Sequence, residues 1–182
     1  IGLRKCLIIT DLDCCKPVEK TDKNGRKTTK YEKAPYDATD DNMVTSNASI
    51  KSFLKISSIK DILSDVPVKL SWDDAAICWK RNNNGNLMIA FQYGKNGAYQ
   101  PRSFEDAFFS ENKEFITSNS FSSLDPECVE KFQEDNNPYE LAQNGVNGKS
   151  SLAIEILLHG NTETNPENGH WNIPNYIKEG LL

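Results

Sequence analysis

The chain has 182 residues, which is enough for one domain with a buried core. Its formal net charge of −5 is not typical of a general nucleic-acid binder, although a nuclease that gathers carboxylates around metal ions can be acidic overall. The five cysteines include an adjacent pair but no C-x-x-C pair, so they indicate neither a zinc site nor a disulfide framework. No apolar run is long enough to cross a bilayer and no signal peptide is visible, so we expect a cytoplasmic protein with reduced thiols and no membrane partner.

Two aspartates follow the first apolar run of the chain. Residues 6–9 are Cys-Leu-Ile-Ile, which predicts a fully buried strand, and we expect residues 5–10 to form a central strand of the sheet. Asp11 and Asp13 come directly after it at i, i+2 spacing, so a continued strand would turn both side chains to the same face. Ligands of open α/β sheets gather at the carboxyl ends of strands, and Mg²⁺ is commonly held by one or two carboxylates. The alternative is an Asx-type turn in which the aspartates accept hydrogen bonds from backbone amides.

Residues 14–46 form a long polar segment, with basic residues in its first half and acidic residues in its second half. The sequence Asp-Lys-Asn-Gly-Arg at 22–26 predicts a turn in a solvated hairpin or loop. A solvated insertion is one interpretation of the segment. The other is a basic loop that contacts a phosphate backbone.

After residue 46, the sequence predicts helices and short strands in alternation, followed by a run of helices. Asn47 is a good N-cap for a helix at 49–54, although Thr45, Ser46 and Asn47 could also hold a phosphate at the helix start. A short helix at 58–63, a short strand at 68–70 and a hairpin of strands 75–80 and 87–93 follow. Helices are then predicted at 103–109, 126–133, 139–143, 149–158 and 171–182, the last with Pro174 in its first turn.

Helix 149–158 is amphipathic. We expect its buried stripe to consist of Ala153, Ile154, Leu157 and Leu158, with Lys149 one turn before Ala153 on the packed side. Although Gly148-Lys149-Ser150 is the tail of a phosphate-binding loop motif, that motif needs a glycine where Gln143 stands.

Several of these segments together resemble a known family. Leu-Ile-Ile-Thr-Asp-Leu-Asp at 7–13 is similar to the Asp-x-Asp strand of Toprim domains, the metal-dependent module of topoisomerases, primases and some nucleases. Thr-Ser-Asn-Ala-Ser-Ile-Lys at 45–51, Arg-Ser-Phe-Glu-Asp-Ala-Phe at 102–108 and Trp-Asn-Ile-Pro-Asn-Tyr-Ile-Lys-Glu-Gly-Leu at 171–181 narrow the resemblance to the overcoming-lysogenization-defect (OLD) family of nucleases. The resemblance implies an α/β fold with a Toprim-like (Rossmann-like), mostly parallel sheet flanked by helices. It also implies a single domain over residues 1–182, with insertions at about 14–46 and 115–147 and a helical C-terminal part.

The resemblance assigns roles to four residues. Asp11 and Asp13 match the metal-binding pair, Glu105 matches a further metal ligand with Asp106 as a weaker candidate, and Lys149 matches a lysine beside the scissile phosphate. Toprim sites also use a glutamate from an earlier strand, and OLD proteins carry an N-terminal ATPase domain, neither of which is in this sequence. The chain alone is therefore expected to be inactive, and ATP to act only through that other domain.

The function expected from the resemblance is DNA cleavage or nicking by a hydrolase with two Mg²⁺ or Mn²⁺ ions, in an ATPase-nuclease of anti-phage defence. Its expected partners are DNA, the ATPase domain of the same chain and further copies in a homo-oligomer. Two cations can activate water and neutralise a phosphodiester, and a lysine can balance the charge of the transition state. The alternative is a non-catalytic α/β interaction module, in which the carboxylates are helix caps and surface charges and Lys149 is solvated or ion-paired.

Overall fold

The chain forms two compact units in the computed structural model, which describes residues 6–64, 79–81, 87–94, 99–160 and 170–181. The first unit comprises Ile1–Ser103 together with Asn175–Leu182, and the second comprises Phe104–Pro174. The sequence predicted one domain with insertions at 14–46 and 115–147. In the structure, residues 115–147 belong to the second unit, together with the helices on either side of them.

The first unit contains a mixed three-stranded sheet. Its described strands are β1 (Cys6–Ile9), β6 (Leu87–Ala90) and β5 (Trp79–Arg81), in the order β1-β6-β5. The pair β1–β6 is parallel and the pair β6–β5 is antiparallel, as the predicted hairpin requires. The mixed α/β class is confirmed. A central position for β1 is wrong for the described strands, because β6 lies in the middle and β1 at the edge; the predicted strand at 68–70 falls outside the described residues.

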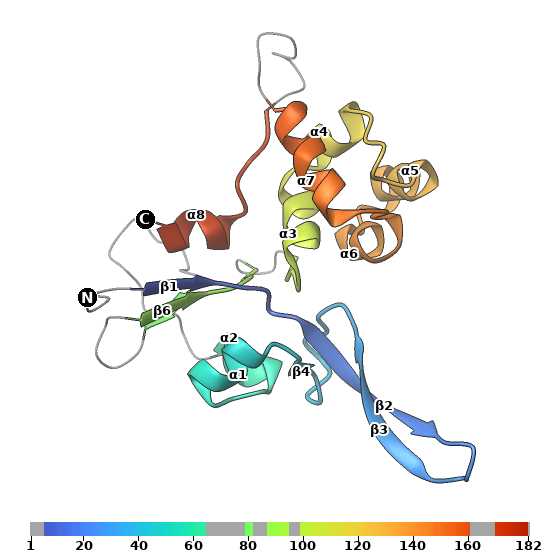
Figure 1. Cartoon of the computed structure of the whole chain (residues 1–182), viewed down its shortest axis with the longest axis vertical. Helices are drawn as coiled ribbons and strands as arrows, with labels where there is room; N and C mark the ends of the chain where they lie inside the picture. Colours follow the sequence, from blue (N-terminus) through green and yellow to red (C-terminus); the bar gives the residue numbers. More distant parts are fainter. Residues whose placement is uncertain (1–5, 65–78, 82–86, 95–98, 161–169, 182) are drawn as a thin grey trace. The chain divides into compact units, whose positions relative to one another are not determined.

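Helices cover both faces of this sheet, as Figure 1 shows. Helices α1 (Ala48–Leu54) and α2 (Ile59–Ser64) pack on the face that carries Ile8 and Ile89. Helix α8 (Asn175–Leu181) lies against the other face, where Gly180 comes so close to the sheet that a Cβ on it would stand 3.0 Å from the Cβ of Ala90.

Strand β1 is less buried than its sequence suggests. None of its four residues is fully buried, and Ile9 is 39% exposed. The prediction of a fully buried strand was therefore wrong, because an edge strand has a neighbour on only one side among the described residues. Helix α8 is also shorter than predicted. It begins at Asn175, since Pro174 disfavours a helical conformation in the residue before it.

A second sheet in the first unit consists of antiparallel strands in the order β3-β2-β4. Strands β2 (Cys14–Thr21) and β3 (Lys27–Lys33) form a long hairpin, and β4 (Val44–Thr45) pairs with the start of β2. The predicted turn is confirmed. Asp22 Oδ1 accepts hydrogen bonds from the amides of Asn24 and Arg26, and Gly25 takes the positive φ of 77° that such a turn needs.

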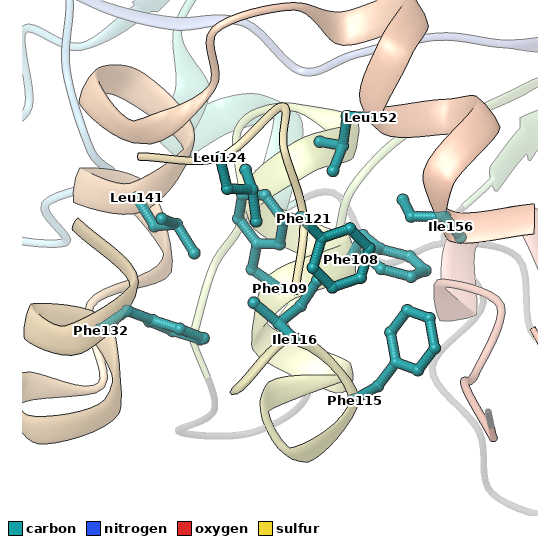
Figure 2. Close-up of a cluster of buried hydrophobic side chains, with 10 residues drawn as sticks. All are labelled: Phe108, Phe109, Phe115, Ile116, Phe121, Leu124, Phe132, Leu141, Leu152 and Ile156. Atoms are coloured by element: carbon teal, nitrogen blue, oxygen red, sulfur yellow. The ribbon is translucent and has the colours of Figure 1, made fainter. Parts of the chain in front are cut away.

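The second unit is helical. Its elements are α3 (Phe104–Glu111), α4 (Lys113–Ser118), α5 (Pro126–Asp135), α6 (Pro138–Glu140), the π-helix η1 (Leu141–Gly145) and α7 (Lys149–Leu158). These helices confirm the predicted helical segments 103–109, 126–133, 139–143 and 149–158. Figure 2 shows their shared core, in which Phe108 and Phe109 of α3 meet Phe132 of α5 and Leu152 of α7. In the part of the chain that the structure describes, no helix has the length and apolar character needed to span a membrane.

The buried face of α7 differs from the predicted one. Leu152 and Ile156 are 2% and 4% exposed, whereas Ile154, Leu157 and Leu158 are 59%, 68% and 72% exposed. The predicted stripe was therefore wrong. Because Leu, Ile and Ala occupy both sides of this helix, the apolar pattern fits two faces, and only packing against the Phe-rich core decides between them.

Candidate functional site

Asp11 and Asp13 lie just beyond the carboxyl end of β1, in a segment without regular secondary structure. The predicted continuation of the strand through the aspartates does not occur. An alternation of side chains nevertheless remains, because Leu12 is fully buried in the core while the aspartates on either side of it are half-buried. The two carboxylates are thus accessible to solvent at the end of a parallel strand pair.

A buried glutamine fixes Asp11. Gln92 is 1% exposed, its Oε1 accepts a hydrogen bond from the Leu12 amide at 2.6 Å, and its Nε2 donates to Asp11 Oδ1 at 2.6 Å. Gln92 follows β6 just as Asp11 follows β1, so the glutamine of one parallel strand holds the aspartate of its neighbour.

The residues before α1 hold the same segment from another side. Thr45 Oγ1 donates to the carbonyl of Leu12 at 2.6 Å, and Asn47 Nδ2 donates to the carbonyl of Asp11 at 2.7 Å. Asn47 Oδ1 accepts from the amides of Ser49 and Ile50, which makes Asn47 the N-cap of α1, as predicted. Thr45 and Asn47 therefore cap a helix and position the aspartate segment at the same time.

Asp13 has an unusual backbone and a charged partner. Its φ of 52° lies in the left-handed region, which Asp and Asn adopt more readily than most other residues. Its amide donates to the carbonyl of Arg102 at 2.8 Å, and its Oδ1 accepts from Arg102 Nη2 at 3.2 Å. The Arg102 side chain is only 7% exposed, so its charge needs a counter-ion nearby, and Asp13 supplies one.

Glu105 and Lys149 meet in the second unit. Glu105 lies in the first turn of α3, where the helix dipole favours a carboxylate, and its side chain is 9% exposed. Lys149 Nζ lies 2.8 Å from Glu105 Oε1, although the lysine side chain as a whole is 70% exposed. Lys149 is the first residue of α7 and stands three residues before the buried Leu152, whereas Ala153, which the sequence placed one turn after it in the buried stripe, is exposed. Asp106 is fully buried.

The ligands present fit a magnesium ion only in part. Asp11 and Asp13 are oxygen donors of the type that Mg²⁺ prefers, and this ion commonly takes one or two carboxylates and completes its shell with phosphate and water. Among the described residues, no group of three or more His, Cys, Asp or Glu side chains is arranged to hold a metal ion. Asp11 and Asp13 could therefore contribute to a metal site but do not complete one.

Comparisons of the chain with protein-family models, with curated proteins and with solved structures gave no match.

Two residues of this arrangement carried no predicted role. Gln92 could have been noticed as the polar residue that closes an apolar strand, in the same relation to β6 as Asp11 has to β1. Arg102 lies in a segment that the sequence singled out, but a single arginine gives no indication that its partner is Asp13, 89 residues earlier. The contact of Gln92 with Asp11 follows from the parallel pairing of β1 with β6, which joins distant parts of the chain.

Proposed function

We propose that this chain carries part of the active site of a Mg²⁺- or Mn²⁺-dependent DNA endonuclease or nickase of the OLD type, with a Toprim-like fold. One observation carries the proposal. Two half-buried carboxylates, Asp11 and Asp13, stand at the carboxyl end of a parallel strand pair, on a segment that side chains of Gln92, Thr45 and Asn47 hold in place. Such fixation is expected of metal ligands, because a site loses affinity when its ligands are free to move.

The proposal gives four residues a role. Asp11 and Asp13 hold the metal, Glu105 is a further carboxylate for it, and Lys149 stabilises the charge that develops on the scissile phosphate. Glu105 stands three positions after Arg102, the partner of Asp13, in the sequence. A bound Mg²⁺ or Mn²⁺ would supply water activation and charge neutralisation. DNA, an ATPase domain of the same protein and a homo-oligomer belong to this proposal, as does a role in anti-phage defence.

A non-catalytic interaction module is the second candidate, and the Arg102–Asp13 ion pair favours it. In that case Asp13 is simply the counter-ion of a buried guanidinium, and removing it would take one anionic partner from Arg102. The Lys149–Glu105 pair has the same reading, with an exposed lysine neutralising a buried carboxylate. The two candidates differ in one property, which is whether the aspartates bind a metal.

The first test is metal binding and cleavage by Asp11→Asn and Asp13→Asn. Asparagine removes the charge, keeps the shape and tolerates the left-handed backbone of Asp13, which alanine would strain. We expect each variant to weaken Mn²⁺ binding at least about tenfold, measured by the loss of free Mn²⁺ in electron paramagnetic resonance, and to abolish nicking of plasmid DNA by the full-length protein. Asp61→Asn, an exposed aspartate of α2, is the matched control and should leave both unchanged. Unaltered metal-dependent nicking by Asp11→Asn or Asp13→Asn would refute the assignment.

The second test concerns Lys149. Lys149→Gln removes the charge that the proposal directs at the phosphate, so we expect the single-turnover cleavage rate of the full-length protein to fall by about 10²-fold or more, with Mn²⁺ binding retained. Because this change also leaves the buried Glu105 without its partner, Lys149→Arg is the control that keeps the ion pair. Equal cleavage by Lys149→Gln and the wild type would leave Lys149 as an ion-pair partner only.

A further inference from the structure

The β2–β3 hairpin is a two-stranded ribbon that the rest of its unit does not cover. Seven residue pairs join the strands, from Cys15↔Lys33 next to the body of the unit to Thr21↔Lys27 at the turn. All seven residues of β3 are exposed, and from Lys16 onward β2 is exposed except for the half-buried Val18. Figure 1 shows this pair as a long ribbon ending in the turn at residues 22–26. Neither face of the ribbon is therefore buried by described residues.

The ribbon is strongly basic in an acidic chain. Between residues 16 and 33 there are seven Lys or Arg residues against three Asp or Glu residues, an excess of four positive charges in a chain whose formal net charge is −5. The basic residues are Lys16, Lys20, Lys23, Arg26, Lys27, Lys30 and Lys33. Such an asymmetry indicates a binding surface for a polyanion, which the overall charge conceals.

The acidic residues of the ribbon neutralise only part of this charge. Lys20 pairs with Glu32 at 2.5 Å and Lys27 with Glu19 at 3.1 Å. Lys20 and the neighbouring Lys16 and Lys30 lower the pKa of Glu32, Lys20 most strongly. Within the described residues, Lys16, Lys23, Arg26 and Lys30 form no ion pair with a carboxylate.

These four residues are the part of the positive charge that remains for an external partner.

The register places basic side chains on both faces and at the tip. Lys16, Lys20 and Lys30 share one face, because Lys30 stands opposite Val18 and side chains alternate along a strand. Lys27 and Lys33 are on the other face, together with Tyr31, which is 59% exposed. Lys23 and Arg26 lie in the turn.

Because basic side chains lie on both faces of the ribbon and at its tip, they match a groove that carries negative charge along both of its sides. The major groove of duplex DNA admits a two-stranded ribbon, and phosphates line both of its edges. We propose that the β2–β3 ribbon binds duplex DNA, with its lysines and arginine against the phosphate backbone. The choice of DNA as the partner rests on the proposed nuclease function, to which the ribbon adds a means of holding the substrate.

A structural explanation of the lysines competes with this proposal. Exposed strand edges pair readily with other chains, and lysines on such edges prevent the association. That explanation accounts for charged residues along the strands. It does not require positive charge in the turn, where Lys23 and Arg26 lie beyond the last strand pair and outnumber Asp22.

The experiment compares two variants of this chain that lose the same charge. The ribbon variant carries Lys16→Gln, Lys23→Gln, Arg26→Gln and Lys30→Gln. The control variant carries Lys51→Gln, Lys55→Gln, Lys131→Gln and Lys178→Gln, all at exposed positions outside the ribbon. Binding to a random-sequence duplex of 24 base pairs is measured by fluorescence anisotropy in EDTA at several salt concentrations. Circular dichroism verifies that both variants are folded.

We expect the ribbon variant to bind at least about tenfold more weakly than the wild type. The plot of log K against log salt concentration should become shallower by about three to four units, since each lost phosphate contact removes about 0.9. The control variant should stay within about twofold of the wild type. Equal weakening of both variants would refute the proposal, because it would show a general charge effect. Unchanged DNA affinity of the ribbon variant would refute the proposal too. If that variant also self-associated in gel filtration, the lysines would be explained by protection of the exposed strand edges.

Two further comparisons distinguish DNA from an anionic membrane as the partner, and distinguish the ribbon proposal from the nuclease proposal. Wild-type chain that binds vesicles of phosphatidylserine and phosphatidylcholine in a 1:3 ratio but not DNA would overturn the choice of DNA. Because EDTA removes the metal, DNA binding through the ribbon does not depend on Asp11 or Asp13. If the nuclease proposal failed, weaker DNA binding by the ribbon variant would still support the ribbon proposal. If the ribbon variant bound DNA normally, the proposal that Asp11 and Asp13 bind a metal would be unaffected.

Discussion

Glu155 shows how one side chain can connect two segments of the helical unit. From α7, its carboxylate accepts hydrogen bonds from the amides of Ser122 and Ser123, each at 3.0 Å, and from the hydroxyls of both serines. The hydrogen bonds from Ser122 and Ser123 lower the pKa of Glu155 from 4.5 to about 2. The ionised form is thus bound more tightly in the folded unit than in the unfolded chain.

This shift predicts a specific acid sensitivity. A carboxylate whose pKa is lower in the folded state contributes stability above its unfolded pKa and loses it as the pH falls toward the folded value. The contribution of Glu155 should therefore be complete at pH 6 and decline between about pH 4.5 and pH 2. We expect Glu155→Gln to lower the free energy of unfolding by about 1–3 kcal/mol at pH 6 and by less at pH 3, measured by urea denaturation. Glu130→Gln, at an exposed position of α5, is the control; a constant difference between Glu155→Gln and the wild type across this range would contradict the prediction.

The sequence identified the candidate site residues but not the side chains that they bind. The i, i+2 spacing identified Asp11 and Asp13 as accessible carboxylates at the end of a strand, and the structure agrees. It could not identify Gln92 or Arg102 as their hydrogen-bond donors, because those contacts span 81 and 89 residues of the chain. Local patterns specify which side chains leave the core, whereas tertiary pairing specifies what they meet.

At the scale of elements, most helix positions could be predicted, although α4 (Lys113–Ser118) was missed, and helix faces could be predicted less well. Caps and breakers are local signals, and Asn47, Pro126 and Gly148 stand where α1, α5 and α7 begin. The buried face of α7 depended instead on which apolar side chains the Phe-rich core could accept. Figure 2 shows Leu152 and Ile156 directed into that core.

The corrected face of α7 gives a paired prediction. Leu152→Ala should lower the free energy of unfolding by about 2–5 kcal/mol, because it leaves a cavity beside Phe108 and its neighbours. Leu157→Ala makes the same chemical change at a residue that is 68% exposed, so it should stay within about 0.5 kcal/mol of the wild type. Chemical denaturation of the wild type and both variants measures these free energies of unfolding. If the Leu157 variant were the less stable of the two, the originally predicted stripe would be correct.

At the scale of the whole molecule, the sequence predicted the class of the fold but not its division. Alternating strands and helices indicated an α/β protein, which the first unit is. The second unit, Phe104–Pro174, has a core of its own, and no composition change marks its boundaries at Ser103 and Asn175. Compactness depends on contacts between distant residues, and a single sequence does not display them.

The first unit is discontinuous in sequence, and this bears on when its described elements can meet during synthesis. Strand β1 is synthesised before its parallel partner β6, from which residues 10–86 separate it, and α8, which lies against Leu7 and Ala90, is synthesised after both. The second unit is continuous in sequence, so its helices can collapse as soon as they emerge. Among the described elements, the sheet of the first unit can therefore be covered by α8 only after all of Phe104–Pro174 has been synthesised, whereas the second unit needs nothing beyond its own segment.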